Sequence, residues 1–296
     1  GLWPQTAKLS EALPAGIPER VELTEVPFYP QKEYQCGPAA LATALVASGV
    51  KVTPEELVPQ VYLPARKGSL QVEMLATARR HGLVAYQLAP SFEDLLREIA
   101  AGTPVIVLQN LALGEGWHYA VAMGYDFPKG ELVLRSGETE RQVLPFGVHE
   151  TVWKRSNYWA MVALPPGRIP ATADEARWLA AIAALERAGG AAAARTAYGA
   201  FLERWPANTG ASIGLANTLY AAGELRQAEA VLRAAERRDP ASPIVLNNLA
   251  QTLSDLGRDD EALPIIERAV AAGGPHAAAV ADTRRSILER IAKKRQ

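Results

Sequence analysis

The sequence contains a single cysteine in 296 residues and no excess of either charge, with 31 lysines and arginines against 32 aspartates and glutamates. One cysteine cannot form a disulfide within the chain, so cysteine content does not distinguish the cytoplasm from an oxidising compartment. A net charge near zero gives no indication of a nucleic-acid or anionic-membrane partner. No apolar run approaches the ~18 residues that a transmembrane helix needs. We therefore expect no nucleic-acid partner and no transmembrane segment in this sequence.

Motifs for metal and nucleotide chemistry are also missing. The sequence has no HExxH, no paired CxxC and no Walker-type GxxxxGK[ST]. Zinc catalysis and nucleotide hydrolysis therefore have no support, and we expect neither a cofactor nor a bound metal. Histidine, the most frequent general base in enzymes, occurs only four times, at His81, His118, His149 and His276.

Residues 1–20 show no hydrophobic period and are interrupted by prolines. This composition is typical of a leading arm rather than of a packed element. If a leader before Gly1 was removed, the protein would be exported, and either periplasmic or lipid-anchored. The sequence itself leaves the compartment open.

Residues 21–166 alternate between elements in an order that indicates one α+β domain. Helical patterns come first, and mostly strand patterns follow from residue 104 onward. The prolines at 165, 166 and 170 then predict a linker at 167–172. The expected helices are 36–48, a helix beginning at 54, 69–82 and 92–101; the expected strands are 21–26, 84–88, 104–108, 118–124, 131–135, 141–144 and 158–164.

Residues 173–296 contain an internal repeat with a period of 34. Gly189, Gly223 and Gly257 follow this spacing, as do Pro206 and Pro240. A period of 34 with glycine inside each unit and proline between units is typical of helix–turn–helix solenoids. The segment resembles tetratricopeptide repeats. The residues that match that family are Trp178, Leu185, Gly189, Ala194, Tyr198 and Pro206, then Leu215, Gly223, Ala228, Leu232, Ala235 and Pro240, and then Leu249, Gly257, Ala262, Ile266 and Ala269.

The repeat resemblance implies an all-α solenoid of three repeats closed by a capping helix at 276–294. It also implies a protein partner on the concave face. Polar residues that lie there in such repeats are Asn217, Asn247, Asn248 and Gln251. The alternative is that these side chains form ordinary solvated helix surface.

Cys36 immediately precedes an apolar helical run, Ala39 to Val46. A thiol in the first turn of a helix faces unpaired N–H groups and the positive end of the helix dipole, and both favour the nucleophilic thiolate. The alternative is a small buried hydrophobe, as most lone cysteines are. Among the histidines, His118 begins an apolar strand after a glycine-rich segment at 114–117, which suits an imidazole at the edge of a cleft. His81 is interpreted as a helix cap, His149 as part of a surface segment, and His276 as part of the repeats.

The segment from about 20 to 165 resembles papain-like cysteine peptidases that process bacteriocin precursors after a double-glycine leader, a bacterial family. The matching residues are Gln31, Cys36-Gly37-Pro38-Ala39-Ala40-Leu41, the helix at 68–82 and the strand from His118 to Asp126. The resemblance implies Cys36 as the nucleophile, His118 as the general base and Gln31 as an oxyanion donor, with Gln35 as a rival for that last role. It also implies a peptide or protein substrate.

The expected third catalytic residue departs from the family pattern. The family has an aspartate on the strand after the histidine, and this chain has Ser136 there. A serine hydroxyl can accept a hydrogen bond from the imidazole Nδ1–H but brings no charge. Glu138 or Asp126 could substitute, or the enzyme could be slow or inactive.

The expected fold is therefore an α+β papain-like peptidase domain followed by a tetratricopeptide-repeat solenoid, and the expected function is a thiol hydrolase whose repeats recruit a partner. One alternative is a catalytically degenerate domain that acts with the repeats as a binding or assembly module. Another is acyl transfer to a thiol, as in phytochelatin-type relatives. Bacteriocin-processing peptidases are commonly fused to a transporter ATPase, whereas this sequence carries helical repeats and no Walker motif, so export of a leader-bearing peptide does not follow from the resemblance.

Overall fold

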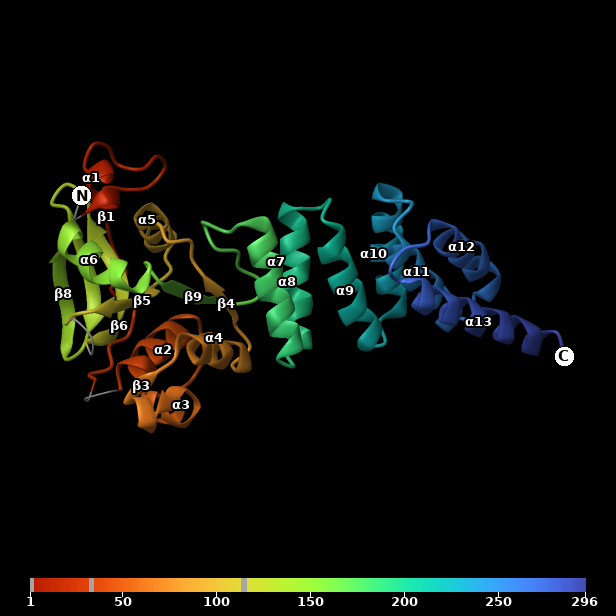
Figure 1. The fold of residues 1–296 in the computed structure, drawn as a ribbon, viewed down its shortest axis with the longest axis horizontal. Coiled ribbons are helices and arrows are strands. Elements are labelled where there is room, and N and C mark those ends of the chain that lie inside the picture. Colours follow the sequence, from red (N-terminus) through yellow and green to blue (C-terminus); the bar gives the residue numbers. More distant parts are fainter. Residues whose placement is uncertain (1–2, 32–34, 113–115) are drawn as a thin grey trace. The chain divides into compact units, whose positions relative to one another are not determined.

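The computed structural model describes residues 3–31, 35–112 and 116–296 (Figure 1). The chain divides into two compact units, residues 1–190 and 191–296. Among the described residues, no helix is both long and apolar enough to cross a lipid bilayer.

Some helices of the first unit begin at side-chain caps. Thr53 accepts a hydrogen bond from the backbone N–H of Glu56, and Ser91 accepts one from that of Asp94. Each satisfies one of the N–H groups left unpaired at a helix start. The helix that begins at Cys36 is buried from Gly37 to Leu45, as its run of alanine and leucine predicts. The bounds are α2 (Cys36–Ala47), α3 (Pro54–Val61), α4 (Gln71–Arg80) and α5 (Phe92–Ala100).

The strands form an antiparallel sheet in the order β4-β9-β5-β6-β7-β8, and β1 pairs with the end of β6. Every residue of β5 and β9 is buried, which is why these strands read as continuous apolar runs rather than alternating ones. The predicted α+β domain with antiparallel strands is thereby confirmed. The bounds are β1 (Arg20–Glu22), β4 (Val84–Gln87), β5 (Val105–Asn110), β6 (Trp117–Asp126), β7 (Glu131–Ser136), β8 (Thr139–Pro145) and β9 (Ala160–Leu164).

Several short elements were not predicted. A hairpin of β2 (Tyr62–Leu63) and β3 (Gly68–Ser69) encloses the 3-10 turn η1 (Pro64–Arg66), and α6 (Phe146–Trp153) leads into the turn η2 (Lys154–Ser156). Two-residue strands and single turns are too short to show a period in sequence. The hairpin and η2 nevertheless carry residues of the candidate site.

The prediction that His149 lies in a surface segment is wrong. His149 is fully buried on α6, stacks on Trp153 with ring centroids 5.3 Å apart, and accepts a hydrogen bond at Nδ1 from Gln109 Nε2 (3.0 Å). Burial lowers the pKa of His149 to about 3, so the ring is neutral at physiological pH. Its role is to pack α6 against β5.

The N-terminal segment, for which no packed element was expected, contains the helix α1 (Pro4–Leu9). Its first backbone N–H groups, those of Gln5 and Thr6, donate to the carboxylate of Glu150 at 2.9 Å each. Burial alone would raise the pKa of Glu150, but these bonds and those from the Thr6 and Tyr158 hydroxyls together lower it. A carboxylate at a helix start is stabilised in this way, and because Glu150 lies about 145 residues away, local composition could not reveal it.

The segment after β9 is also held by backbone N–H groups that donate to a carboxylate. Glu98 of α5 accepts hydrogen bonds from the backbone N–H groups of Ala171 (3.0 Å) and Thr172 (2.9 Å). The next helix, α7 (Glu175–Arg187), places Trp178 edge-on to Tyr86 of β4, with ring centroids 5.4 Å apart. The helix α7 belongs to the first compact unit, which extends to residue 190. The domain boundaries predicted at 166 and 173 stay a prediction.

The second unit is a run of antiparallel helix pairs. The glycines spaced by 34 residues occupy the turns with positive φ, +78° at Gly223 and +79° at Gly257, a conformation that costs glycine nothing. Asn208 and Ser242 cap the helices that follow. The predicted run of helical repeats is confirmed. The bounds are α8 (Ala191–Arg204), α9 (Thr209–Ala221), α10 (Leu225–Arg238), α11 (Pro243–Asp255), α12 (Asp259–Ala272) and α13 (Ala277–Lys294).

Candidate active site

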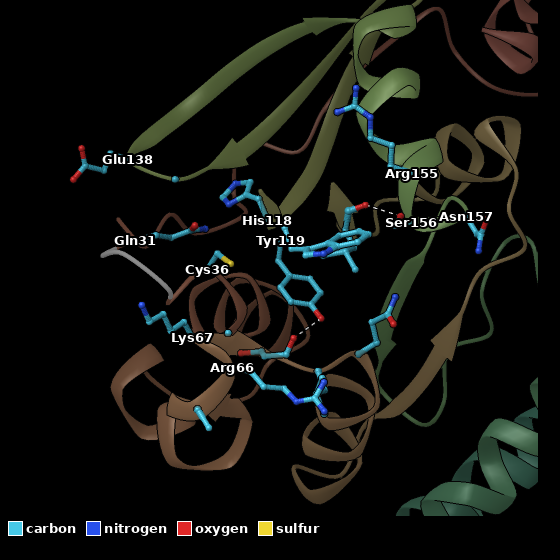
Figure 2. A pocket seen from close by; sticks show the side chains of 18 residues that line it. Gln31, Cys36, Arg66, Lys67, His118, Tyr119, Glu138, Arg155, Ser156 and Asn157 are labelled. Carbon is cyan, nitrogen blue, oxygen red and sulfur yellow. Dashed lines mark hydrogen bonds between the residues drawn. The ribbon is translucent and has the colours of Figure 1, made fainter. Parts of the chain in front are cut away.

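The first unit contains a cleft of about 1060 Å³. Figure 2 shows that Gln31, Cys36 and His118 all face it, although they come from three separate segments of the chain. The structure thus brings together three of the four residues predicted from sequence. Ser136, the fourth, is not part of the described lining but lies within hydrogen-bond distance of His118. The described lining of the cleft is Gln31, Cys36, 65–71, Leu108, 117–119, 137–138 and 155–157.

Cys36 is the first residue of α2, and its neighbour Gly37 explains how the cleft wall approaches it. A Cβ atom at position 37 would come within 2.2 Å of Ser69 Oγ on β3. Only glycine therefore lets β3 pack directly on the start of α2. Glycine therefore follows Cys36 for a steric reason, which is separate from the chemistry of the thiol.

The protonation state of Cys36 differs from the expectation. Backbone N–H groups of Tyr119 on β6, and of Gly37 and Cys36 at the helix start, stabilise a thiolate. Burial acts in the opposite direction and is the larger effect, so the pKa of Cys36 is raised above its ordinary value. The resting group at neutral pH is therefore a thiol, which needs a base before it can attack.

His118 supplies an imidazole in the correct state for that role. It lies near the start of β6, paired across the sheet with Gln109, and its Nε2 lies 2.9 Å from Ser136 Oγ. Burial lowers the pKa of His118. When Nε2–H donates to Ser136, Nδ1 is an acceptor that can take the thiol proton. The predicted contact with Ser136 exists, but it involves Nε2 and not Nδ1.

Neither acidic alternative supplies the missing charge. Asp126 is at the opposite end of β6, eight residues from His118, which is ~26 Å along a strand, and it pairs with Arg20 at 3.2 Å. Glu138 lines the cleft, but Figure 2 shows its carboxylate pointing away from His118. The neutral hydroxyl of Ser136 is thus the group that faces the imidazole.

The two glutamines are placed differently. Gln31 is fixed by a hydrogen bond from its backbone N–H to the carbonyl of Gly137 (3.2 Å), and its side chain faces the cleft. Gln35 is the N-cap residue of α2 and does not belong to the described lining. This arrangement favours Gln31 as the amide beside Cys36.

Sequence reasoning missed Tyr119, which connects the nucleophile to the cleft wall. Its backbone N–H faces Cys36, and its hydroxyl donates to the carbonyl of Ser69 (3.0 Å). Burial raises the pKa of Tyr119, and the nearby Cys36 adds a smaller effect in the same direction, so the hydroxyl stays a donor. The available signal was its position directly after His118 at the start of the strand.

We expect the rate of Cys36 alkylation by iodoacetamide to continue rising above pH ~8.5, the ordinary thiol pKa. Only the thiolate reacts, and a raised pKa moves its formation to higher pH. Mass spectrometry of the intact chain between pH ~5 and ~10, a range that brackets ordinary thiol titration, measures this directly because Cys36 is the only cysteine. A free cysteine in a short peptide is the control. Fast, pH-independent alkylation below pH ~7 would instead indicate a stable thiolate–imidazolium pair.

Comparison with known families finds matches to both parts of the chain. The model of the Peptidase C39-like family matches residues 23–160, and two tetratricopeptide-repeat models match residues 173–245 and 213–278. The chain therefore carries a C39-like peptidase domain followed by tetratricopeptide repeats, which confirms the resemblance given by its motifs. Processing of bacteriocin precursors stays a prediction.

Two solved structures are similar to parts of the chain. One is described as a C39-like peptidase from Bacillus anthracis, with 19% identity and a TM-score of 0.43, covering 50% of this chain and 98% of its own. The other is a thermophilic tetratricopeptide-repeat protein from Thermus thermophilus, with 22% identity and a TM-score of 0.35, covering 40% of this chain and 72% of its own. No curated protein matches the sequence.

Proposed function

We propose that the first domain is a cysteine peptidase that hydrolyses a peptide or amide bond through Cys36 and His118, and that the repeats recruit a peptide or protein partner. The observation that carries this proposal is the shared cleft, in which a thiol at a helix start and a neutral imidazole face the same space. The family match of residues 23–160 supports the peptidase class.

The chemistry follows from the resting protonation states. As Cys36 Sγ bonds to the carbonyl carbon, its proton passes to His118 Nδ1, and the imidazolium donates through Nε2–H to Ser136. The oxyanion is bound by the backbone N–H of Cys36 and by the amide of Gln31, and a donor of this kind is worth ~3 kcal/mol. The C–N bond then breaks and Nδ1 protonates the leaving amine. Water, deprotonated by the same nitrogen, then attacks the thioester carbonyl; the C–S bond breaks, the carboxylic acid product leaves, and Nδ1–H returns its proton to the Cys36 sulfur.

A proteome-derived peptide mixture provides the test, because the substrate is not known. We expect the wild-type protein to produce new peptide termini, identified by mass spectrometry, that Cys36→Ala does not produce. Cys36→Ser is the matched control, since it replaces the thiol with a hydroxyl of similar size that is a far weaker nucleophile. Equal cleavage by wild type and Cys36→Ala would contradict the proposal.

A second candidate function rests on the contact between His118 and Ser136. A neutral third residue and a buried thiol with a raised pKa are also what a catalytically degenerate domain would retain. In that case the domain and the repeats together form an assembly module. Complementation of a deletion strain separates the two: an assembly module would function with Cys36→Ala but not with substitutions at Asn217 and Asn248, which are hydrogen-bonded to each other at 3.2 Å.

A further inference from the structure

The described lining of the cleft carries more positive than negative side chains. Arg66 and Lys67 come from the β2–β3 hairpin, Arg155 comes from η2, and Glu138 is the carboxylate among them. Figure 2 shows Arg66 and Arg155 on opposite sides of the space in front of His118. The charged side chains of the described lining are thus mostly positive, whereas the whole chain has a net charge of −1.

Arg155 is exposed to solvent but is held in place by a hydrogen bond to the sheet. Its Nη1 donates to the backbone carbonyl of Asn110 (2.7 Å), and Asn110 pairs across the sheet with Trp117, the neighbour of His118. Ser156 fixes the same turn by donating to the carbonyl of Leu108 (2.7 Å). A guanidinium has five N–H donors, so the bond to Asn110 leaves others for a ligand.

Arg66 lies on a wall that is also fixed. It ends η1, and the hairpin that carries it is anchored by the hydrogen bond from Tyr119 to Ser69 (3.0 Å). Arg66 and Arg155 are both exposed to solvent. Their charges therefore act on whatever enters the cleft without the cost of removing a buried cation from water.

We propose that the cleft selects peptide segments with aspartate or glutamate close to the scissile bond, and that Arg66 and Arg155 determine this preference. The proposal rests on the proposed peptidase function. Cations along the walls of a concave cleft raise the local concentration of anions and repel basic segments. Guanidinium groups also bind carboxylates through paired hydrogen bonds, which gives orientation as well as attraction.

A first test uses two alkylating reagents of similar size and needs no peptide. Iodoacetate is an anion and iodoacetamide is neutral, so the ratio of their rates with Cys36 reports the charge felt at the nucleophile. We expect this ratio to exceed that of glutathione by about threefold or more at low salt, and to fall toward it in ~0.5 M NaCl, because salt screens exposed charges.

The variants Arg66→Gln and Arg155→Gln should each lower the rate ratio, and Glu138→Gln should raise it. Arg141→Gln is the matched control, because it removes the same charge from β8, outside the described lining of the cleft. A ratio equal to that of glutathione, or equal losses in Arg141→Gln and the cleft variants, would overturn the proposal.

The second test is the sequence preference around the cleavage sites in the peptide mixture. We expect aspartate and glutamate to be enriched near the cleaved bond in the wild type, and lysine and arginine to replace them in the double variant R66E/R155E. Cleavage without any charge preference would overturn this inference and leave the peptidase function standing. A raised iodoacetate ratio without any cleavage would support an anion-selective cleft and contradict the peptidase function.

Discussion

Replacing His118 with alanine is expected to lower kcat/KM for peptide hydrolysis by about 10³-fold, within the usual range for loss of a general base. The effect is large because the pKa of Cys36 is raised by burial, so very little thiolate exists at neutral pH without a base. The same imidazole must also protonate the leaving amine. Initial rates on a peptide identified from the mixture measure the loss.

The control for this variant is His276→Gln, which removes an exposed histidine from the repeat unit. It should leave the rate within about twofold of the wild type. Thermal unfolding of His118→Ala should show one transition near the wild-type Tm, which excludes global unfolding as the cause of the loss. A fully folded His118→Ala with wild-type activity would remove His118 from the mechanism.

The rate should also depend on pH in a defined direction. The neutral thiol–imidazole pair is the reactive form, and burial lowers the pKa of His118 below ~6.5. Activity should therefore be retained through the mildly acidic range and fall only as pH drops below that lowered value. Initial rates on the same peptide across the acidic range measure this fall, the acid limb of the pH profile.

Features encoded by local sequence could be predicted well. The start of α3 follows from Thr53-Pro54 and that of α5 from Ser91, because a cap acts on N–H groups only two or three residues away. The repeat period was equally visible, since Gly223 and Gly257 mark turns that each unit needs separately. Such signals require no knowledge of the rest of the fold.

Features that depend on distant partners could not be predicted. His149 is polar and stands next to Glu150 and near Lys154, a pattern typical of a surface. Its burial becomes clear only once Gln109, forty residues earlier, is seen to donate to it. The helix α1 depends on Glu150 in the same way.

The candidate site shows both cases at once. Cys36 and His118 could be identified from their local context, a helix start and a strand start. Their protonation states could not, because the burial that outweighs the helix start at Cys36 arises from the walls that β3 and β6 build around it. The charge of those walls was hidden for the same reason, since Arg66 and Arg155 lie far apart in the sequence.

Ser136→Asp is expected to raise kcat by about tenfold, because it places a carboxylate where a neutral hydroxyl now lies 2.9 Å from His118 Nε2. In the serine-protease triad, replacing the aspartate with a neutral amide costs ~10⁴ in kcat. The expected gain is smaller, since position 136 is only 8% exposed and a buried carboxylate loses hydration there. Steady-state kinetics on the same peptide would measure it, with Ser136→Asn as the uncharged control of matching shape.

The pH profile separates a charge effect from a positioning effect. A carboxylate beside His118 favours the imidazolium, so the pKa of His118 should rise and the acid limb should move to higher pH in Ser136→Asp. Ser136→Asn should leave the limb in place, and Ser136→Ala should lower the rate by leaving Nε2–H without its acceptor. If Ser136→Asp shifts the limb but brings no gain in kcat, the hydroxyl already supplies all the orientation that the chemistry needs, and the absence of the aspartate does not limit this enzyme. If neither the limb nor the rate changes in any of the three variants, the contact between His118 and Ser136 has no part in catalysis.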